Sequence, residues 1–282
     1  MQNIIKAGVI GDPISHSLSP AIHNFFLKKY NINGSYEAIL IKKENLQESV
    51  FKLVNQGFAG FNVTIPHKEE IFKICDFKSK TASLTKAVNT VIVTSDKKLF
   101  GHNSDCEGFL NNLKENFLDF SLENKNCFVI GAGGAARAII YSLIKSQVKN
   151  IFITNRSEKR VLDLISDFSN FAKEKKCNLF FLNQNDFEEK LSRCDLLINS
   201  TSLGMQGCEP LVINLKNLNQ NAIVYDIVYK PLETNLLKIA KERNNRTLGG
   251  IGMLAHQALI GFEAWFKQKP QIDQKLIKIL CK

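Results

Sequence analysis

Short apolar runs alternate with amphipathic helical patterns along most of this 282-residue chain. In the first third, the apolar runs that predict strands lie at 5–10, 35–41, 60–65, 88–94 and 98–101. The helical patterns that alternate with them cover 19–29, 44–55, 67–74, 79–85 and 105–115. The last two apolar runs flank a Ser-Asp-Lys turn, which predicts a β-hairpin. Strands that alternate with helices predict an α/β fold with mainly parallel sheets.

In the middle of the chain, an apolar run over 127–130 ends in a glycine-rich turn, Gly131-x-Gly133-x-x-Ala136. An amphipathic helical pattern and a second apolar run follow the turn. In this order the first glycine permits a tight turn, and the second lets the backbone approach a pyrophosphate. The alanine allows close helix–strand packing, and the helix N-terminus faces the phosphates. The pattern predicts a dinucleotide-binding domain, with a purely structural glycine turn as the alternative.

The end of the second apolar run favours NADP over NAD. NAD-binding proteins place an Asp or Glu there for the ribose 2′-hydroxyl, whereas this chain has Asn155 and Arg156, followed by Arg160. Guanidinium groups bind a 2′-phosphate through charge-assisted hydrogen bonds. The alternative is a pair of solvated arginines at a helix start, but cations there oppose the helix dipole, so a phosphate explains them better.

Four short polar segments in the first third are rich in hydroxyl and amide side chains. They cover 16–20, 62–68, 87–90 and 101–105, each at a strand end or a strand–helix junction. Ligands of open α/β sheets bind at the carboxyl ends of the strands, and such groups suit a ligand with several hydroxyls and a carboxylate. Taken singly, each segment could be only a turn or a cap, with Ser19 as the N-cap of a helix that has Pro20 in its first turn.

The order of these patterns predicts two domains. An α/β substrate domain with a mainly parallel sheet covers 1–105 and is completed by 251–282. A Rossmann-like NADP-binding domain covers 106–250, with further strands near 179–182, 196–200 and 222–227. The return to the first domain is placed at the chain-breaking pair Gly249-Gly250, before a long helical pattern that contains Gln257.

Composition narrows the function further. The net charge is +10, but the lysines are scattered and no basic cluster is interleaved with aromatics, which argues against nucleic-acid binding. Seven cysteines without CxxC spacing and five histidines without a ligand pattern suggest no metal site and no disulfide framework. No apolar run is long enough to span a membrane, and no secretory signal is visible, so we expect a cytoplasmic protein that binds no membrane.

The chain resembles shikimate dehydrogenase over nearly its whole length. The matching stretches are GDPISHSLSP, GFNVTIPHKE, AVNT, GHNSDCEG, VIGAGGAARA, TNRSEKR, NSTSLGM, YDIVYKPLETNLL and GGIGMLAHQA. The resemblance implies an oxidoreductase that interconverts 3-dehydroshikimate and shikimate with NADP(H), in the pathway to chorismate and the aromatic amino acids. It also implies a small-molecule partner and leaves a homodimer open.

The resemblance assigns roles to individual residues. Lys68 would be the acid/base residue, paired with Asp105. The substrate would contact Ser17, Ser19, Asn62, Thr64, Asn89, Asp105, Tyr229 and Gln257, the two serines binding its carboxylate. The cofactor would contact Gly131, Ala132, Gly133, Gly134, Ala135, Asn155, Arg156, Arg160, Thr201, Ile227, Gly250 and Met253.

Three positions depart from the family pattern. Ser104 replaces the usual threonine and keeps a hydroxyl, and Lys86 stands where glycine is usual. Lys80 lies near a position that is often acidic, so no cofactor contact is assigned to it.

Two other readings remain. A quinate/shikimate dehydrogenase with dual cofactor use would tend to have an acidic residue near 155–157, which this chain lacks. A non-catalytic NADP-binding sensor would not need the intact Lys68, Asp105 and Gln257.

Overall fold

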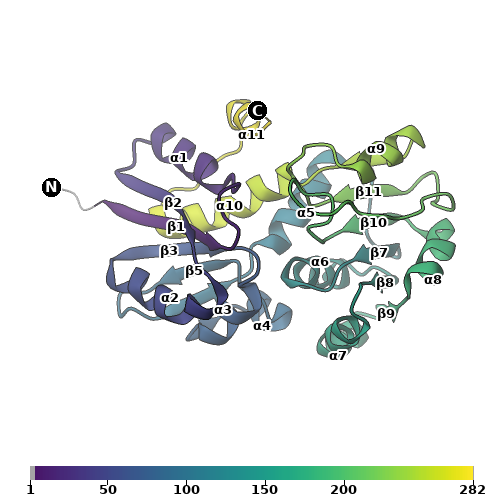
Figure 1. Ribbon diagram of the computed structural model, residues 1–282, viewed down its shortest axis with the longest axis horizontal. Helices are drawn as coiled ribbons and strands as arrows, with labels where there is room; N and C mark the ends of the chain where they lie inside the picture. The colour runs from purple at the N-terminus through teal and green to yellow at the C-terminus, as the bar shows by residue number, and fades with distance from the viewer. Residues whose placement is uncertain (1–3, 282) are drawn as a thin grey trace. The chain divides into compact units, whose positions relative to one another are not determined.

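The computed structural model describes residues 4–281, and the chain forms two compact units, whose elements are labelled in Figure 1. The first unit takes in the residues up to Gly108 and those from Leu254 onward, and the second is Phe109–Met253. The chain changes unit inside helix α5 (Asp105–Asn116) and returns inside helix α10 (Ile251–Phe266). The sequence-based boundaries lay at the starts of these helices, because a sequence signals where a helix begins but not where an unbroken helix changes unit.

The described part of the first unit contains a six-stranded sheet in the order β2-β1-β3-β5-β6-β4. The strands are β1 (Ile5–Gly11), β2 (Gly34–Leu40), β3 (Phe58–Val63), β4 (Phe77–Lys78), β5 (Thr90–Val93) and β6 (Leu99–His102). Strand β1 is parallel to β2 and β3, and β4 is parallel to β6, whereas β5 is antiparallel to both of its neighbours. The predicted hairpin is therefore confirmed as β5–β6.

Helices of the first unit form where apolar residues recur at helical spacing. They are α1 (Ser19–Lys29), α2 (Leu46–Asn55), α3 (Lys68–Ile74), α4 (Lys80–Thr85) and α11 (Gln274–Leu280), with a 3₁₀ turn at Lys43–Asn45. Val50 of α2 and Ile71 of α3 pack with Phe61 of β3 in a fully buried core. The expectation that Ser19 is an N-cap is wrong, because α1 begins at Ser19 itself and Leu18 occupies the cap position; Pro20 lies in the first turn as predicted.

The sheet of the second unit is parallel throughout, with six strands described in the order β12-β11-β10-β7-β8-β9. The strands are β7 (Asn126–Ile130), β8 (Asn150–Thr154), β9 (Asn178–Phe181), β10 (Leu196–Asn199), β11 (Ile223–Asp226) and β12 (Arg246–Leu248). Read from β7, this is the doubly wound order of dinucleotide-binding folds, and it reverses between β7 and β10. The predicted α/β class and Rossmann-like fold are confirmed, although the three residues of β12 were too few to predict a strand.

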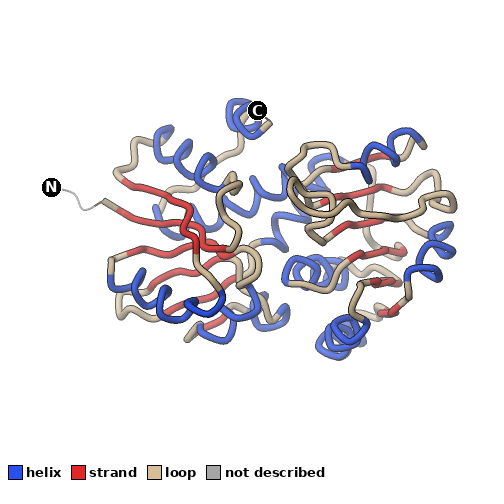
Figure 2. Tube along the Cα trace, viewed as in Figure 1, coloured by secondary structure: helices blue, strands red, loops and turns tan. Residues whose placement is uncertain are grey.

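Helices surround this second sheet, and Figure 2 shows the strands of each unit flanked by helices. They are the rest of α5, with α6 (Gly134–Lys145), α7 (Glu158–Glu174), α8 (Gln184–Glu189) and α9 (Asn235–Glu242), and a 3₁₀ turn at Lys190–Arg193. Phe128 of β7 and Phe187 of α8 are fully buried in the core and meet edge to face at 5.1 Å. The core fixes the carboxyl ends of β7, β10 and β11, where a ligand binds in this fold.

Candidate active site

Lys68 and Asp105 form the centre of a polar cluster in the first unit. Lys68 is the first residue of α3, after the loop that leaves β3, and Asp105 is the first residue of α5. Lys68 Nζ donates to Asp105 Oδ2 at 2.5 Å, and the two side chains are only 14% and 8% exposed. A carboxylate in the first turn of a helix is stabilised by the helix dipole. The structure thus brings the two predicted catalytic residues into a nearly buried ion pair.

Backbone contacts hold Lys68 at this place. The Lys68 carbonyl accepts a hydrogen bond from Val88 N at 2.9 Å, which ties α3 to the segment before β5. His67, the preceding residue, is buried, and its Nε2 lies 2.6 Å from the Ile41 carbonyl oxygen. A carbonyl oxygen can only accept, so Nε2 carries the proton and the imidazole anchors the loop.

Asn89 connects the ion pair to the rest of the cluster. Its Oδ1 accepts from Ser104 N at 2.7 Å, so its Nδ2 must face the other way. That Nδ2 donates to Asp105 Oδ1 at 2.8 Å and to Gln257 Oε1 at 3.3 Å. Gln257 Nε2 donates to the Leu254 carbonyl at 3.0 Å, which uses one of its two N–H groups. Asn89 therefore orients Asp105 and Gln257, and Gln257 keeps one N–H group for a ligand.

The remaining predicted substrate residues lie at the carboxyl ends of β1 and β3, apart from Tyr229. Ser17 Oγ accepts from Ser19 N at 3.3 Å; Ser17 is half-buried and Ser19 buried. Thr64 follows β3, and a Cβ placed on Gly11 would lie 2.5 Å from its Cγ2, so a glycine lets these loops meet. Tyr229 belongs to the second unit, in the segment after β11, and its approach to the substrate stays a prediction.

In the second unit, the glycine turn is shaped for a phosphate group. Gly131 has φ 116°, and a Cβ there would lie 2.6 Å from Ser200 Oγ, so only glycine fits. Gly133, at the N-cap of α6, is different, since a Cβ there would meet no atom within 4 Å. Ala136 is fully buried in α6. The open space at Gly133, before a helix N-terminus, fits a pyrophosphate.

The N-terminus of α7, like that of α6, has no side-chain hydrogen bond from its cap residue. Ser157 occupies the cap position of α7, and Gly133 occupies that of α6. The caps of α1, α2 and α3 also make no such bond, whereas the cap side chains of α4, α8, α9 and α11 accept from the first turn. Arg156 and Arg160 are exposed at the start of α7, and Asn155 Nδ2 donates to the Ser157 carbonyl at 3.1 Å. Backbone donors beside two guanidinium groups fit the 2′-phosphate of NADP.

A buried carboxylate orders the loops after β10 and β11. Asp226 accepts from Thr234 Oγ1 at 2.7 Å, Asn199 Nδ2 at 2.9 Å and Val228 N at 3.0 Å. Burial raises the pKa of Asp226, and these three donors act in the opposite direction. Thr201 Oγ1 donates to Asn199 Oδ1 at 2.7 Å. The network thereby fixes the predicted cofactor residue Thr201 and the loop that carries Tyr229.

Two further predicted cofactor residues, Gly250 and Met253, follow β12. A Cβ on Gly250 would fall 2.0 Å from the Ile227 carbonyl oxygen, so glycine is required there. Met253 is buried in the first turn of α10. Asn199, Asp226 and Thr234 were not among the predicted site residues, although they lie in the NSTSLGM and YDIVYKPLETNLL stretches. The signal that could have identified them is the apolar run of β11, which ends in the carboxylate of Asp226.

The buried cysteines of the chain have structural roles. Burial raises the pKa of Cys75 and of Cys177 to about 12, and it also raises those of Cys127 and Cys194, so these thiols are poor nucleophiles. Within residues 4–281, no group of three or more His, Cys, Asp or Glu side chains could hold a metal ion. In the same range, no helix is both long and apolar enough to cross a membrane.

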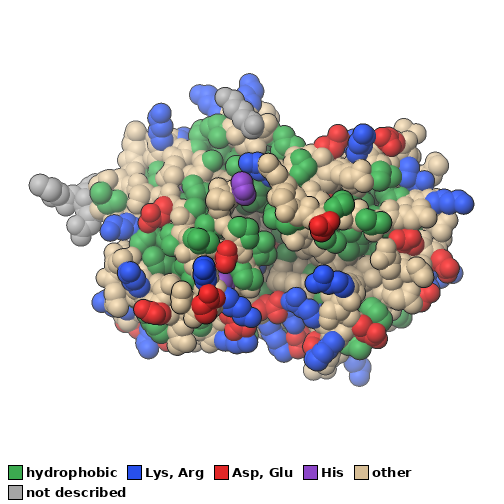
Figure 3. Space-filling model, in the orientation of Figure 1, with side chains coloured by type: hydrophobic (Ala, Val, Ile, Leu, Met, Phe, Trp, Pro, Cys, Tyr) green, Lys and Arg blue, Asp and Glu red, His purple; other side chains and the backbone are tan. Residues whose placement is uncertain are grey.

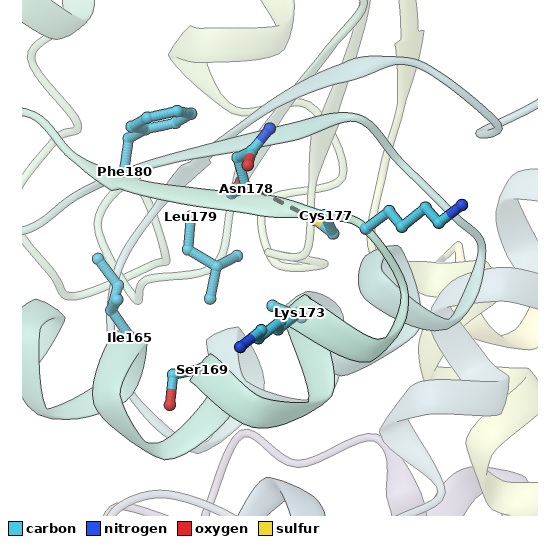
Figure 4. A pocket seen from close by; sticks show the side chains of 9 residues that line it. Ile165, Ser169, Lys173, Cys177, Asn178, Leu179 and Phe180 are labelled. Carbon is cyan, nitrogen blue, oxygen red and sulfur yellow. Dashed lines mark hydrogen bonds between the residues drawn. The ribbon is translucent and has the colours of Figure 1, made fainter.

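A shallow hollow of about 520 Å³ lies elsewhere, between α7 and the edge strand β9 (Figure 4). It is lined by Ile165, Ser169, Ala172, Lys173, Lys176, Cys177, Asn178, Leu179 and Phe180. None of these is a predicted site residue, and the lining has few of the convergent polar groups that a substrate site needs. On the face that Figure 3 shows, lysine and arginine side chains are interspersed with acidic ones.

Comparisons with known proteins give matches over most of the chain. A family model described as "Shikimate dehydrogenase substrate binding domain" matches residues 9–91, and one described as "Shikimate / quinate 5-dehydrogenase" matches residues 112–220. The shikimate dehydrogenase (NADP(+)) of Paramagnetospirillum magneticum is 40% identical over 270 residues, which cover 96% of this chain and 95% of that protein.

Solved structures share the whole fold. Shikimate 5-dehydrogenase from Thermus thermophilus, in complex with NADP(H) and shikimate, aligns with a TM-score of 0.84 and 31% identity over 99% of this chain and 98% of its own. Quinate dehydrogenase from Corynebacterium glutamicum, in complex with NAD, aligns with a TM-score of 0.86 and 26% identity over 98% of this chain and 97% of its own. The fold therefore fits both substrates, and the choice depends on individual residues.

Proposed function

Because the chain belongs to the shikimate dehydrogenase family, we propose that it is an NADP-dependent oxidoreductase that interconverts 3-dehydroshikimate and shikimate. The reaction is a step on the way to chorismate and the aromatic amino acids. The observation that carries the proposal is the Lys68–Asp105 pair, joined at 2.5 Å and fixed by Asn89. A lysine held beside a carboxylate at the end of a sheet can move a proton to or from a substrate oxygen.

Lys68 is the proton donor and acceptor in this mechanism. During reduction, negative charge grows on the C3 carbonyl oxygen, and a cationic Lys68 stabilises that oxygen and delivers its proton. During oxidation, a neutral Lys68 accepts the proton of the C3 hydroxyl. Asp105 keeps the lysine in place through Oδ2 and offers its remaining lone pairs to a neighbouring hydroxyl.

The other side chains of the first unit bind and orient the substrate. Ser17 and Ser19 anchor its carboxylate, which does not change charge in the reaction, so they act mainly on binding. Thr64, Asn62 and the remaining N–H group of Gln257 meet its ring hydroxyls. Tyr229 completes the proposed set of substrate contacts.

The second unit holds the cofactor. NADPH, when bound, supplies the hydride. The Gly131–Ala135 turn binds the pyrophosphate, Asn155, Arg156 and Arg160 surround the 2′-phosphate, and the nicotinamide side is lined by Thr201, Ile227, Gly250 and Met253. The open space at Gly133 and the exposed side chains of Arg156 and Arg160 support this assignment.

Replacing Arg156 with alanine tests the cofactor assignment. A charge-assisted hydrogen bond contributes about 1.5–3 kcal/mol, so the KM for NADP should rise about tenfold or more, while the KM for NAD changes little. Arg193, exposed in the same unit, provides the control variant Arg193→Ala, which should alter neither constant. Equal effects of Arg156→Ala on the two cofactors would contradict the assignment.

One assay tests the proposed activity against its nearest alternative. The purified chain is given NADP⁺ or NAD⁺ with shikimate or quinate, and the absorbance of the reduced nicotinamide is followed. We expect the highest kcat/KM with shikimate and NADP⁺. A preference for quinate and NAD⁺ would assign the chain to the alternative, and no turnover with any pair would favour a non-catalytic binding protein.

A cytoplasmic location completes the proposal, and the resemblance leaves a homodimer open. The family's biosynthetic role supports the location, and cell fractionation checks it. Light scattering on the purified chain checks the assembly, and the mass of a single chain would contradict a homodimer.

A further inference from the structure

Tyr36 of β2 reaches across the first sheet to Asn62 of β3. Ala7 of β1 pairs with both Tyr36 and Gly60, so these three residues present the same face of the sheet. Ala7 has only a methyl group beside the tyrosine, and Trp265 fills the space over Gly60. Asn62 lies two residues beyond Gly60 on that face, and the Tyr36 hydroxyl donates to Asn62 Oδ1 at 2.7 Å.

The hydrogen bonds of Asn62 determine how it can meet a ligand. Its Nδ2 donates to the Asn89 carbonyl at 3.1 Å and to Thr90 Oγ1 at 3.2 Å. A carbonyl oxygen only accepts, so Nδ2 must point there and Oδ1 must point to Tyr36. Both N–H groups of Asn62 are therefore used inside the protein. Oδ1 has two lone pairs, and Tyr36 takes one of them, so Asn62 can meet a substrate hydroxyl only as an acceptor.

Two aromatic rings hold Tyr36 in this position. The His23 ring stacks on it with centroids 3.9 Å apart and planes at 6°, and the Trp265 ring lies at 6.0 Å. Burial raises the pKa of Tyr36 well above its ordinary value, with the Ser19 side chain opposing the shift, so its hydroxyl keeps its proton and donates.

His23 acts through its ring face. It is completely buried, and neither of its ring nitrogens has a hydrogen-bond partner among the described residues. Burial lowers the pKa of His23 to about 3, against an opposite influence from Asn62, so the imidazole is neutral at physiological pH. The neutral ring contributes here by stacking on Tyr36.

We propose that Tyr36 is a positioning residue for the substrate: its hydroxyl orients the Asn62 amide so that Oδ1 accepts from one ring hydroxyl, and His23 fixes the tyrosine ring. This inference rests on the proposed function and names the residue that sets the polarity of one hydroxyl contact. Without the Tyr36 hydroxyl, Asn62 keeps its two donor contacts, but its acceptor oxygen loses the partner that fixes it.

The experiment compares Tyr36→Phe with Tyr225→Phe. Tyr225 is a matched control, because it is also buried and its hydroxyl accepts from Asn112 Nδ2 at 2.7 Å in the second unit. Each variant loses one buried hydroxyl, but only Tyr36 touches a proposed substrate residue. Tyr36→Phe should raise the KM for shikimate about tenfold, with kcat within about threefold and the KM for NADP unchanged. Tyr225→Phe should leave all three constants near wild type.

Three deoxy analogues of shikimate, each lacking one ring hydroxyl, identify the contact. In the wild-type chain, one of them should bind less tightly than shikimate because it cannot donate to Asn62. In Tyr36→Phe, the penalty for that analogue should shrink while the other two penalties persist. A structural role alone would leave all three penalties unchanged in Tyr36→Phe, and this result would overturn the inference.

The outcomes also separate this inference from the proposed function. No turnover of shikimate by the wild-type chain would overturn the proposed function. Normal wild-type turnover, with Tyr36→Phe equal to Tyr225→Phe, would overturn only the role of Tyr36. If Tyr36→Phe does not fold, His23→Leu and His23→Phe replace it. The leucine variant should raise the KM for shikimate about threefold, and the phenylalanine variant should restore it because an aromatic ring still stacks; an unchanged KM in His23→Leu would overturn the inference.

Discussion

The proposed site of the first unit is built mainly from side chains, and that of the second unit mainly from backbone. In the first unit the site consists of side chains such as Asn62, Asn89 and Gln257, which fix one another through hydrogen bonds. In the second unit it consists largely of backbone: a glycine turn and the N-termini of two helices. A side-chain network can place one proton and tell a donor from an acceptor, whereas backbone N–H groups recognise a phosphate by its charge. Changes in the first unit should therefore alter turnover or the recognition of single hydroxyl groups, and changes in the second unit mainly the affinity for the cofactor.

The largest effect should come from Lys68→Ala. General acid–base groups contribute about 10²–10⁴-fold, so turnover of shikimate should fall at least by the lower factor. The KM for NADP should stay near wild type, because Lys68 belongs to the first unit. Steady-state kinetics with each ligand varied in turn measures both effects.

Lys73→Ala is the matched control for that variant. Lys73 lies on the same helix α3, is 68% exposed and pairs with Glu70 on the surface. Its removal should leave turnover unchanged, since exposed ion pairs contribute little. Turnover in Lys68→Ala within a few-fold of that in Lys73→Ala would end the catalytic assignment and remove the contrast between the units.

The next effect is acid sensitivity caused by His23 in the first unit. Its pKa is about 3 in the folded chain and 6.5 when the side chain is exposed, so the unfolded state binds the proton more readily. This contribution to stability is complete above the exposed value and is lost as the pH falls below it. Between pH 7 and pH 5 the loss should be roughly 2 kcal/mol of unfolding free energy.

The variant His23→Phe isolates this loss. Urea unfolding of both chains at the two pH values should show a smaller decrease for the variant, while the other titrating groups affect both chains equally. An equal decrease in unfolding free energy for the two chains would show that His23 does not cause the acid sensitivity.

Gly133→Ala tests the backbone site of the second unit. A Cβ there meets no protein atom within 4 Å, so the stability of the chain should hardly change. The methyl group would occupy the space assigned to the pyrophosphate, so the dissociation constant for NADP should rise about tenfold. Calorimetric titration measures the constant, and thermal unfolding measures the stability.

Gly131→Ala gives a different combination two residues earlier in the chain. With φ 116° and Ser200 Oγ only 2.6 Å from the added Cβ, this variant should lose stability as well as affinity. If Gly133→Ala bound NADP like the wild-type chain, the pyrophosphate would have to lie elsewhere.

The smallest effect concerns a strained backbone position in the first unit. Lys86 has φ 51°, a left-handed conformation that favours glycine, at the end of α4. Lys86→Gly should raise the free energy of unfolding by roughly 0.5–1 kcal/mol without changing turnover. Lys80→Gly, at the start of the same helix, should instead lower it slightly, since glycine is a poor helix former. Equal changes in the free energy of unfolding of both variants would show that glycine relieves no backbone strain at position 86.

Much of this architecture could be predicted from the sequence, because local signals determine it. The apolar run before Gly131 and the helical pattern after it gave the fold of the second unit. The departure at Lys86 became interpretable only with its backbone angle, which a residue type alone does not reveal. Ser19 appeared to be a cap because serine favours that position, but the helix begins one residue earlier than a cap would require.

Partners distant in sequence were the part that could not be predicted. Tyr36 and Asn62 lie in separate strands, and only the parallel register of β2, β1 and β3 brings them to one face. The Asp226 network likewise depends on Asn199, which lies on the neighbouring strand β10. Such pairings follow from sheet topology, which a single sequence specifies only through the whole fold.

The return of the chain within α10 has a consequence for the order of events on the ribosome. Gly60 leaves a gap in the first sheet that Trp265 fills, since a Cβ there would lie 2.1 Å from Trp265 Nε1, and that nitrogen donates to the Val91 carbonyl at 2.9 Å. All of Phe109–Met253 emerges before this tryptophan does. The unit that starts first is therefore completed last: the nascent chain can finish the fold of its second unit while the unit that contains Lys68 still awaits its final helices.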